Sequence, residues 1–216
     1  MDFERARRQM VTEQLEARGL VDPHVLAAMA CVPRHRFVGP SLIERAYEDL
    51  PLPIGLQQTI SQPYMVGLMT AALELTTAGD RVLEVGTGSG YQAAVLAALG
   101  AQVTTVERIP ELAARARATL DALGLAERVT VVEGDGTLGW PPWAPYDAIV
   151  VTAGGPGIPR PLLRQLGPGG RLVVPVGDEE RQELVRLRYR DGRLVEECLG
   201  GCRFVKLRGR HGWEDG

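Results

Sequence analysis

The chain of 216 residues is 45% hydrophobic and 24% charged, which is ordinary for a globular protein with one sizeable core. Its net charge of −3, without a run of Lys or Arg, argues against a nucleic-acid partner. It has no apolar run of membrane-spanning length, and residues 2–5 are too charged for a secretory signal, so we expect no membrane partner and a cytoplasmic location.

The first third of the chain predicts helices separated by an irregular segment. Residues 2–18 place their apolar side chains on one helical face, and Gly19 suits the end of that helix. Residues 22–29 begin with Asp-Pro, a helix cap followed by proline in the first turn. Residues 39–63 contain several Pro and Gly and no long periodic element, and such stretches in compact domains are usually functional. A further helix is expected at 64–75.

Short strands and helices alternate through the rest of the chain. We predict strands at 82–86, 103–106, 129–132, 147–152 and 171–176, helices at 91–99, 111–123 and near 159–166, and antiparallel strands at about 183–190, 193–199 and 203–207, with Asp191-Gly192 as a hairpin turn. Repeated β-α units with short connections indicate a parallel sheet with helices on both faces. The expected fold is therefore α/β, a Rossmann-like, doubly wound, mostly parallel sheet with an N-terminal helical segment and C-terminal antiparallel strands.

The stretch that follows the first predicted strand is a glycine turn. Gly86, Gly88 and Gly90 alternate with two hydroxylated residues and lead into a helix. Glycine suits positive φ or a close backbone approach to a ligand, and the start of a helix offers free N–H groups. Such a turn at the carboxyl end of a parallel strand is where open α/β sheets bind nucleotides. A turn without any ligand is also compatible with this pattern.

The spacing of these glycines indicates which nucleotide to expect. A dinucleotide motif needs a third small residue where this chain has Tyr91, whose bulk would hinder close strand–helix packing. Glu84, two residues before the first glycine, together with Gly-x-Gly-x-Gly, resembles the first motif of S-adenosylmethionine (AdoMet) methyltransferases.

Two further acidic residues follow the next predicted strands. Glu107 could accept hydrogen bonds from ribose hydroxyls, and Asp135 from an adenine amine. Singly, each is a weak signal: Glu107 alone is better explained as a charge at a strand end, and Asp135 suits a turn residue in Gly-Asp-Gly. All three features at consecutive strand ends predict a nucleotide-type binding site.

The methyl acceptor is constrained by what the chain lacks. There is no metal-ligand cluster, residues 151–156 lack the Asp/Asn-Pro-Pro-aromatic motif of amine methyltransferases, and no cysteine follows a proline as in cytosine-C5 enzymes. A carboxylate, with a pKa of about 4, is already ionised and needs only alignment and a dry pocket.

Residues 57–64 place polar side chains before a helix. There Ser61 is equally well explained as a donor to the substrate or as the cap of the helix near Pro63.

Several segments together resemble the protein-L-isoaspartate O-methyltransferase family. The resemblance runs from about residue 5 to Trp213, and Thr-Ile-Ser-Gln-Pro is its most specific part. It rests on Val32-Pro33-Arg34 with Phe37-Val38, Ala46-Tyr47-Glu48-Asp49, Pro51-Leu52-Pro53-Ile54-Gly55, residues 58–64, residues 84–94, Val106-Glu107-Arg108, Gly134-Asp135-Gly136, residues 146–153 and Pro175-Val176-Gly177. One departure is Lys206, where the family usually has proline.

The resemblance implies an enzyme that methylates the free α-carboxylate of L-isoaspartyl residues in damaged proteins and peptides. AdoMet would be the donor and S-adenosyl-L-homocysteine (AdoHcy) the product, with no metal. The ester would then cyclise to a succinimide without the enzyme, which begins repair. The resemblance leaves D-aspartyl residues open as a second substrate, and we expect a monomer.

The resemblance also assigns roles to residues. Ser61 matches the active-site, catalytic serine. The expected cofactor-binding residues are Thr59, Ile60, Ser61, Glu84, Gly86, Gly88, Gly90, Glu107, Arg108, Asp135 and Gly136. The expected substrate-binding residues are Ile54, Gln58, Thr59, Tyr64 and Thr152. We expect one domain spanning 1–216, with 1–76 on the substrate side and 77–216 forming the cofactor-binding core and the C-terminal strands.

Three other functions stay possible from the sequence alone. An AdoMet enzyme acting on RNA or a small molecule would show a basic face or an amine-type motif. An NAD-dependent oxidoreductase is disfavoured by Tyr91. A non-catalytic nucleotide-binding module would bind the cofactor without transferring a group.

Overall fold

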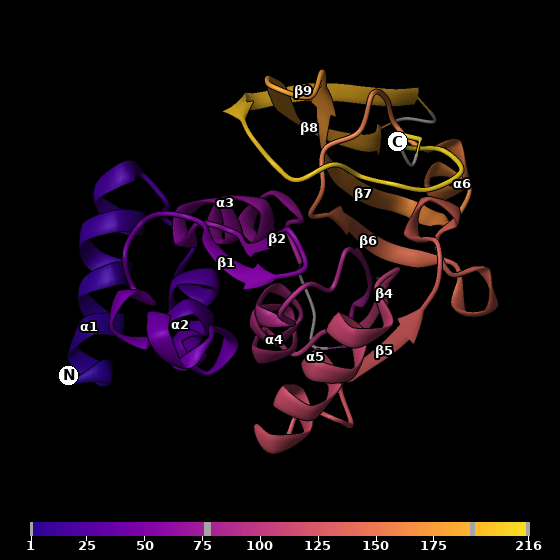
Figure 1. The fold of residues 1–216 in the computed structure, drawn as a ribbon. Helices are drawn as coiled ribbons and strands as arrows, with labels where there is room; N and C mark the ends of the chain where they lie inside the picture. The colour runs from indigo at the N-terminus through magenta and orange to yellow at the C-terminus, as the bar shows by residue number, and fades with distance from the viewer. Residues whose placement is uncertain (1, 76–78, 191–192, 215–216) are drawn as a thin grey trace.

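The computed structural model describes residues 2–75, 79–190 and 193–214. Figure 1 shows the N-terminal helices to the left of a twisted sheet and the C-terminal strands at the upper edge of that sheet. The helices are α1 (Phe3–Gln9), α2 (Pro23–Cys31), α3 (Pro63–Ala72), α4 (Tyr91–Ala98), α5 (Pro110–Ala122) and α6 (Arg160–Leu163), and the shorter turns are the π-helix η1 (Met10–Leu15) and the 3₁₀ helices η2 (Glu16–Arg18), η3 (Arg34–Phe37), η4 (Pro40–Arg45), η5 (Gly136–Leu138) and η6 (Pro141–Trp143). The strands are β1 (Leu52–Gly55), β2 (Gln58–Ile60), β3 (Arg81–Val85), β4 (Gln102–Glu107), β5 (Val129–Glu133), β6 (Tyr146–Val151), β7 (Leu166–Gly177), β8 (Gln182–Arg190) and β9 (Arg193–Cys202).

The main sheet has the order β5-β4-β3-β6-β7-β8-β9. Neighbouring strands from β5 to β7 are parallel, and β8 and β9 are added antiparallel. The chain moves outward from β3 to β4 and β5 and then returns to β6 on the other side of β3. This reversal opens a crevice at the carboxyl ends of β3 and β6, which is where ligands bind in open α/β sheets. The expected α/β fold is confirmed.

Alternate side chains of the central strands belong to two separate cores. Val82 packs with side chains of α2, α3, α4 and α5, whereas Leu83 packs with α6 and the segment around Leu207. This is the alternation that a strand buried on both faces requires. Helices therefore cover both faces as predicted, although α6 has only four residues and extended chain covers much of its face.

The N-terminal segment follows local sequence signals. Asp2 and Asp22 accept hydrogen bonds from backbone N–H groups in the first turns of α1 and α2, as helix caps do. The helix predicted over 2–18 continues from α1 through a π-helical turn and a 3₁₀ turn, and it ends at Gly19 with φ of +86°. The irregular residues 39–63 are ordered into η4 and the β1–β2 hairpin.

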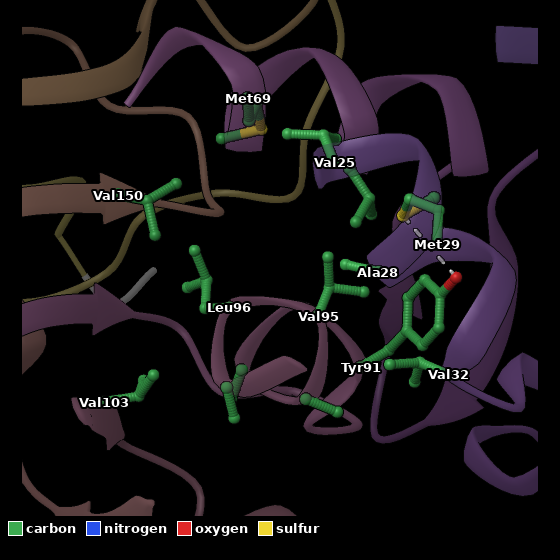
Figure 2. Close-up of a cluster of buried hydrophobic side chains, with 14 of the residues drawn as sticks. Val25, Ala28, Met29, Val32, Met69, Tyr91, Val95, Leu96, Val103 and Val150 are labelled. Carbon is green, nitrogen blue, oxygen red and sulfur yellow. Dashed lines mark hydrogen bonds between the residues drawn. The ribbon is translucent and has the colours of Figure 1, made fainter. Parts of the chain in front are cut away.

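The residue after the glycine turn, Tyr91, joins the two parts of the molecule. Its side chain is 1% exposed, and its ring meets Phe37 edge-on with 5.4 Å between centroids. Figure 2 shows the hydroxyl of Tyr91 directed at Met29 of α2, where it donates to the sulfur at 3.8 Å. The large side chain of Tyr91 is therefore part of the core that packs the N-terminal helices against α4.

The prediction of a strand at 203–207 is wrong. This segment leaves β9 and crosses to the end of β6 (the yellow trace in Figure 1), where Lys206 makes one isolated parallel bridge with Gly154. Gly154 N donates to Val205 O and Leu207 N donates to Gly154 O, both at 2.8 Å. The predicted turn at residues 191–192 lies outside the described residues. Among the helices described, none has the length and apolar character needed to cross a bilayer.

Candidate functional site

A cavity opens at the carboxyl ends of β3, β4 and β6. It encloses about 810 Å³ of space including the open solvent at its mouth. Most of the predicted site residues line it: Gln58, Thr59, Ile60, Ser61, Glu84, Gly86, Gly88, Glu107, Arg108, Gly136 and Thr152. In the part of the chain that the structure describes, no group of three His, Cys, Asp or Glu side chains could hold a metal ion.

The glycine turn forms a tight corner at one wall of this cavity. Gly86, Gly88 and Gly90 have φ of +94°, +53° and +87°, the left-handed region that favours glycine. A Cβ at Gly86 would lie only 2.6 Å from the Thr152 hydroxyl, which donates to the Gly86 carbonyl at 2.6 Å. Thr152 therefore fixes the backbone of the corner from the end of β6.

Glu107 fixes the same corner from the end of β4. Its carboxylate accepts from Gly88 N at 2.8 Å and from Ile109 N at 3.0 Å, and the residue is only 5% exposed. Each carboxylate oxygen has a second lone pair. Glu107 thus holds the loop in place and keeps capacity to accept from two neighbouring hydroxyls of a ribose.

Glu84 is the least satisfied polar group in the site. The residue is fully buried, and neither carboxylate oxygen has a hydrogen-bond partner among the described residues. Burial raises the pKa of Glu84 to about 8; the neighbouring Thr105 hydroxyl partly lowers it, and the nearby charge of Glu107 acts in the same direction as burial. An unpaired buried acid is unfavourable, and a cationic ligand in the cavity would compensate it. AdoMet carries an ammonium and a sulfonium, so the site fits this cofactor.

Ser61 faces the cavity from the opposite wall. In the described chain its hydroxyl has no hydrogen-bond partner, and Gln62 is the residue at the cap position of α3. The N–H of Tyr64 in the first turn is instead satisfied by Asp49 Oδ1 at 3.2 Å. The interpretation of Ser61 as the cap of this helix is therefore not what the structure shows.

Four predicted residues lie outside the cavity lining. Ile54 approaches the corner, since a Cβ at Gly88 would lie 3.6 Å from its Cδ1. The ring of Tyr64 lies under the Arg18 guanidinium at 3.5 Å. Gly90 packs against α5, with Leu120 Cδ1 at 3.3 Å from the position of a Cβ.

Asp135, the fourth, is engaged with the chain itself. Its Oδ1 accepts from Thr137 N at 2.9 Å and its Oδ2 from Arg210 N at 2.8 Å. The next residue, Gly136, does line the cavity, and a Cβ there would lie 2.5 Å from Val85 Cγ1. The loop therefore meets the cavity through Gly136, while the Asp135 carboxylate anchors the C-terminal segment.

Sequence reasoning missed one wall of the cavity. Val205, Lys206, Leu207 and Arg208 line it, and Lys206 Nζ also pairs with Glu179 Oε1 at 2.7 Å. No local pattern marks these residues, because contacts with distant parts of the chain, such as Gly154 and Asp135, bring them to the site.

Comparisons of the sequence with known proteins give a consistent match over nearly the whole chain. The family model described as protein-L-isoaspartate (D-aspartate) O-methyltransferase matches residues 6–212. A protein-L-isoaspartate O-methyltransferase of Methanoculleus marisnigri is 58% identical over 210 residues, which cover 97% of this chain and 94% of the relative. One from Trichlorobacter lovleyi is 55% identical over 215 residues, with 99% and 98% covered.

Solved structures show the same fold. A protein-L-isoaspartate O-methyltransferase superposes with a TM-score of 0.85 at 32% identity, covering 95% of this chain and 67% of that one. A structure from Plasmodium falciparum, described as a protein-L-isoaspartate O-methyltransferase in complex with S-adenosyl-L-homocysteine, has a TM-score of 0.81 at 24% identity and covers 94% and 98%.

The first prediction concerns the corner. Gly86→Ala should weaken AdoHcy binding by more than about tenfold, because the new Cβ collides with Thr152 and forces the corner to move. Gly124→Ala is the matched control, since Gly124 also has a positive φ, +72°, but nothing lies within 4 Å of its Cβ position. Isothermal titration calorimetry measures both affinities. Equal affinity in wild type and Gly86→Ala would contradict this assignment.

The second prediction concerns Glu84 and pH. Below about pH 4.5 the carboxyl is protonated in both the folded and the unfolded protein, whereas between there and about pH 8 only the folded protein retains the proton. The unfolded state then binds fewer protons, so this group lowers the free energy of unfolding as pH rises. Glu84→Gln should therefore become more stable relative to wild type between pH 5 and pH 8, measured by urea unfolding without ligand. A difference that does not change with pH would argue against a buried, unpaired acid.

Proposed function

This chain belongs to the protein-L-isoaspartate (D-aspartate) O-methyltransferase family, and we propose how its own residues carry out the family's reaction. It is an AdoMet-dependent enzyme that methylates the free α-carboxylate of L-isoaspartyl residues in damaged proteins and peptides, which starts repair through a succinimide. The observation that carries the residue assignment is the cavity in which the unpaired Ser61 hydroxyl and the glycine corner line the same space.

The glycine corner and the carboxylates beside it would hold the cofactor. When bound, AdoMet supplies an electrophilic methyl group, and its sulfur retains the electron pair of the broken bond as AdoHcy forms. Gly86 and Gly88 allow close approach to the corner, and Glu107 accepts from the ribose hydroxyls. Glu84, which is buried and lines the cavity, would compensate the positive charge of the methionine portion, and that charge would offset the burial of the carboxylate.

Ser61 would orient the substrate carboxylate. That carboxylate is ionised at neutral pH, so the reaction needs no base to create the nucleophile. It needs one oxygen aligned with the methyl carbon, and alignment alone can supply a large part of the rate enhancement. The Ser61 hydroxyl, which no other described residue uses, donates to the carboxylate and directs it. Thr59 and Gln58 lie beside Ser61 on β2 and complete this wall.

Positive charge at the same cavity would favour an anionic substrate. Arg108, Lys206 and Arg208 all line it together with Glu84 and Glu107, and Lys206 also pairs with Glu179. Cations around a cleft raise the local concentration of oppositely charged ligands, and this effect weakens as the salt concentration rises. This supports a carboxylate as the group that enters.

Several expectations stay predictions. These are turnover of D-aspartyl residues, a monomeric state, the absence of a nucleic-acid partner, a cytoplasmic location and a single domain divided near residue 76, where the boundary falls on residues outside the described part. Membership of the family argues against an NAD-dependent oxidoreductase, against a methyltransferase for RNA or a small molecule, and against a non-catalytic binding module.

The third prediction tests the substrate. With AdoMet labelled in its methyl group, the enzyme should methylate a peptide containing L-isoaspartate and should leave the same peptide with normal aspartate at background level. The two peptides have the same composition and charge, so only the position of the free carboxylate differs. Equal labelling of both peptides, or of neither, would refute the proposed activity.

The fourth prediction tests Ser61. Ser61→Ala should lower kcat on the isoaspartyl peptide by roughly ten- to a hundredfold, because a hydrogen bond to an ionised group is lost in the transition state. AdoHcy affinity should change by less than about twofold, since the corner is untouched. Ser41→Ala, on the exposed surface of η4, is the matched control and should retain wild-type kcat. Unchanged turnover in Ser61→Ala would remove Ser61 from the mechanism.

A further inference from the structure

Asp49 is the centre of a polar cluster directly behind Ser61. It lies between η4 and β1, and it reaches the start of α3 across a gap in sequence of more than ten residues. Its Oδ1 accepts from Tyr64 N at 3.2 Å, and its Oδ2 accepts from Gln62 Nε2 at 2.8 Å. The backbone carbonyl of Asp49 accepts from the same Gln62 nitrogen at 3.0 Å.

This cluster caps the start of α3, a role that the sequence alone would equally allow for Ser61. The first N–H groups of a helix need acceptors from outside the helix, and a nearby serine is a preferred one. Pro63 stands in the first turn and has no N–H, and Tyr64 N is bonded to Asp49. The helix start is thus satisfied without the Ser61 hydroxyl, which is left to the cavity.

The N-terminal helical segment holds Asp49 in turn. Arg18 in η2 pairs with Asp49 Oδ2 at 2.8 Å, and its guanidinium lies 3.5 Å from the centre of the Tyr64 ring. Gln14 donates to the carbonyl of Tyr47 at 2.7 Å. The loop carrying Asp49 is therefore tied to the N-terminal segment on one side and to the start of α3 on the other.

We infer that Asp49 is a positioning residue for methyl transfer: by capping α3 and holding Gln62, it keeps the Ser61 hydroxyl free and directed at the substrate carboxylate. This inference rests on the role proposed above for Ser61. Asp49 itself does not line the cavity, so it acts through the segment that ends at Tyr64.

The inference gives a signature that a purely structural role lacks. If Asp49 works through Ser61, its contribution to kcat exists only while the serine hydroxyl is present. Asp49→Asn keeps the shape but replaces one acceptor oxygen by a donor, so its single oxygen cannot serve both Tyr64 N, which uses Oδ1, and the Arg18 and Gln62 side chains, which share Oδ2. Its effect should therefore depend on residue 61.

The experiment is a double-mutant cycle on the isoaspartyl peptide. Asp49→Asn should lower kcat about tenfold in the Ser61 protein but less than about twofold in Ser61→Ala, with AdoHcy affinity within about twofold of wild type throughout. Amide hydrogen exchange in the ligand-free protein should also become faster at Tyr64. Asp22→Asn is the matched control: Asp22 caps α2 through His24 N and Val25 N, and its substitution should leave kcat unchanged in both backgrounds.

Thermal unfolding would reveal whether Asp49→Asn fails to fold. If it does, a milder variant tests the same inference. Arg18→Gln removes the ion pair from a half-exposed side chain while leaving both oxygens of Asp49 in place. It should lower kcat in the same direction by a smaller factor, again only when Ser61 is present.

The outcomes separate this inference from the function on which it rests. If the wild-type enzyme does not distinguish the isoaspartyl peptide from the normal aspartyl peptide, the proposed function is overturned. If Ser61→Ala keeps full turnover, the role of Ser61 is overturned. In either case the inference about Asp49 is overturned as well. If Ser61→Ala is slow, but Asp49→Asn lowers kcat by the same factor with and without the Ser61 hydroxyl, or does not lower it at all, only the inference about Asp49 is overturned.

Discussion

The site depends on the burial of Tyr91, the side chain that directly follows the glycine corner. The corner belongs to the sheet, whereas the wall with Ser61 belongs to the N-terminal segment, and a cavity exists only where the two are held at a fixed distance. Tyr91 provides this link, because α4 starts at the corner and its first side chain ends in the core beside Met29 and Phe37. Arg34 lies with its guanidinium carbon 4.9 Å from the centre of the same ring. That cation is fully buried, which lowers its pKa to about 10, and the ring face and the Ala46 carbonyl partly compensate its burial.

The two acidic residues of the cavity illustrate how environment divides tasks between like groups. Glu107 is bonded to two backbone N–H groups, so its charge is satisfied by the fold and it rigidifies the loop. Glu84 lies one strand away on β3, buried and unpaired, with its pKa raised to about 8. Natural proteins rarely leave a buried polar group unsatisfied, and the exceptions gather at functional sites. The Glu107 carboxylate therefore holds the loop of the site in place, and the Glu84 carboxylate is available to a cation that enters the cavity.

The parts of this fold that depend on local pattern can be predicted from the sequence, and the parts that depend on distant contacts cannot. Strand β3, the corner and the cap at Asp22 each follow from residues close together in the chain, and the predicted positions agree with the structure to within about a residue. The segment 203–207 has apolar residues typical of a strand, yet its partner is Gly154, about fifty residues earlier. The bulk of Tyr91 excludes a dinucleotide motif, but its packing partners come from another third of the chain.

The same limit applies to the roles of single carboxylates. Asp135 stands in a Gly-Asp-Gly turn where a ligand acceptor and a turn residue have the same sequence signature. In the folded protein Arg210 N uses one of its oxygens, which no spacing rule could anticipate. The sequence does not decide between capping and catalysis for Ser61 for the same reason, since the acceptor that decides the matter is Asp49, well outside any local window.

The C-terminal segment explains why so simple a reaction needs almost the whole chain. A reaction without a general base relies on alignment and on exclusion of water, so each wall of the cavity must be rigid. The wall around Lys206 comes from extended chain, which has no helix or sheet to stiffen it. Hydrogen bonds fasten it instead to Gly154, through two backbone bonds and through Trp213 Nε1 at 3.0 Å, and to Asp135 through Arg210 N. The closure of the cavity thus depends on the C-terminal segment, which bonds to the loops that follow β5 and β6.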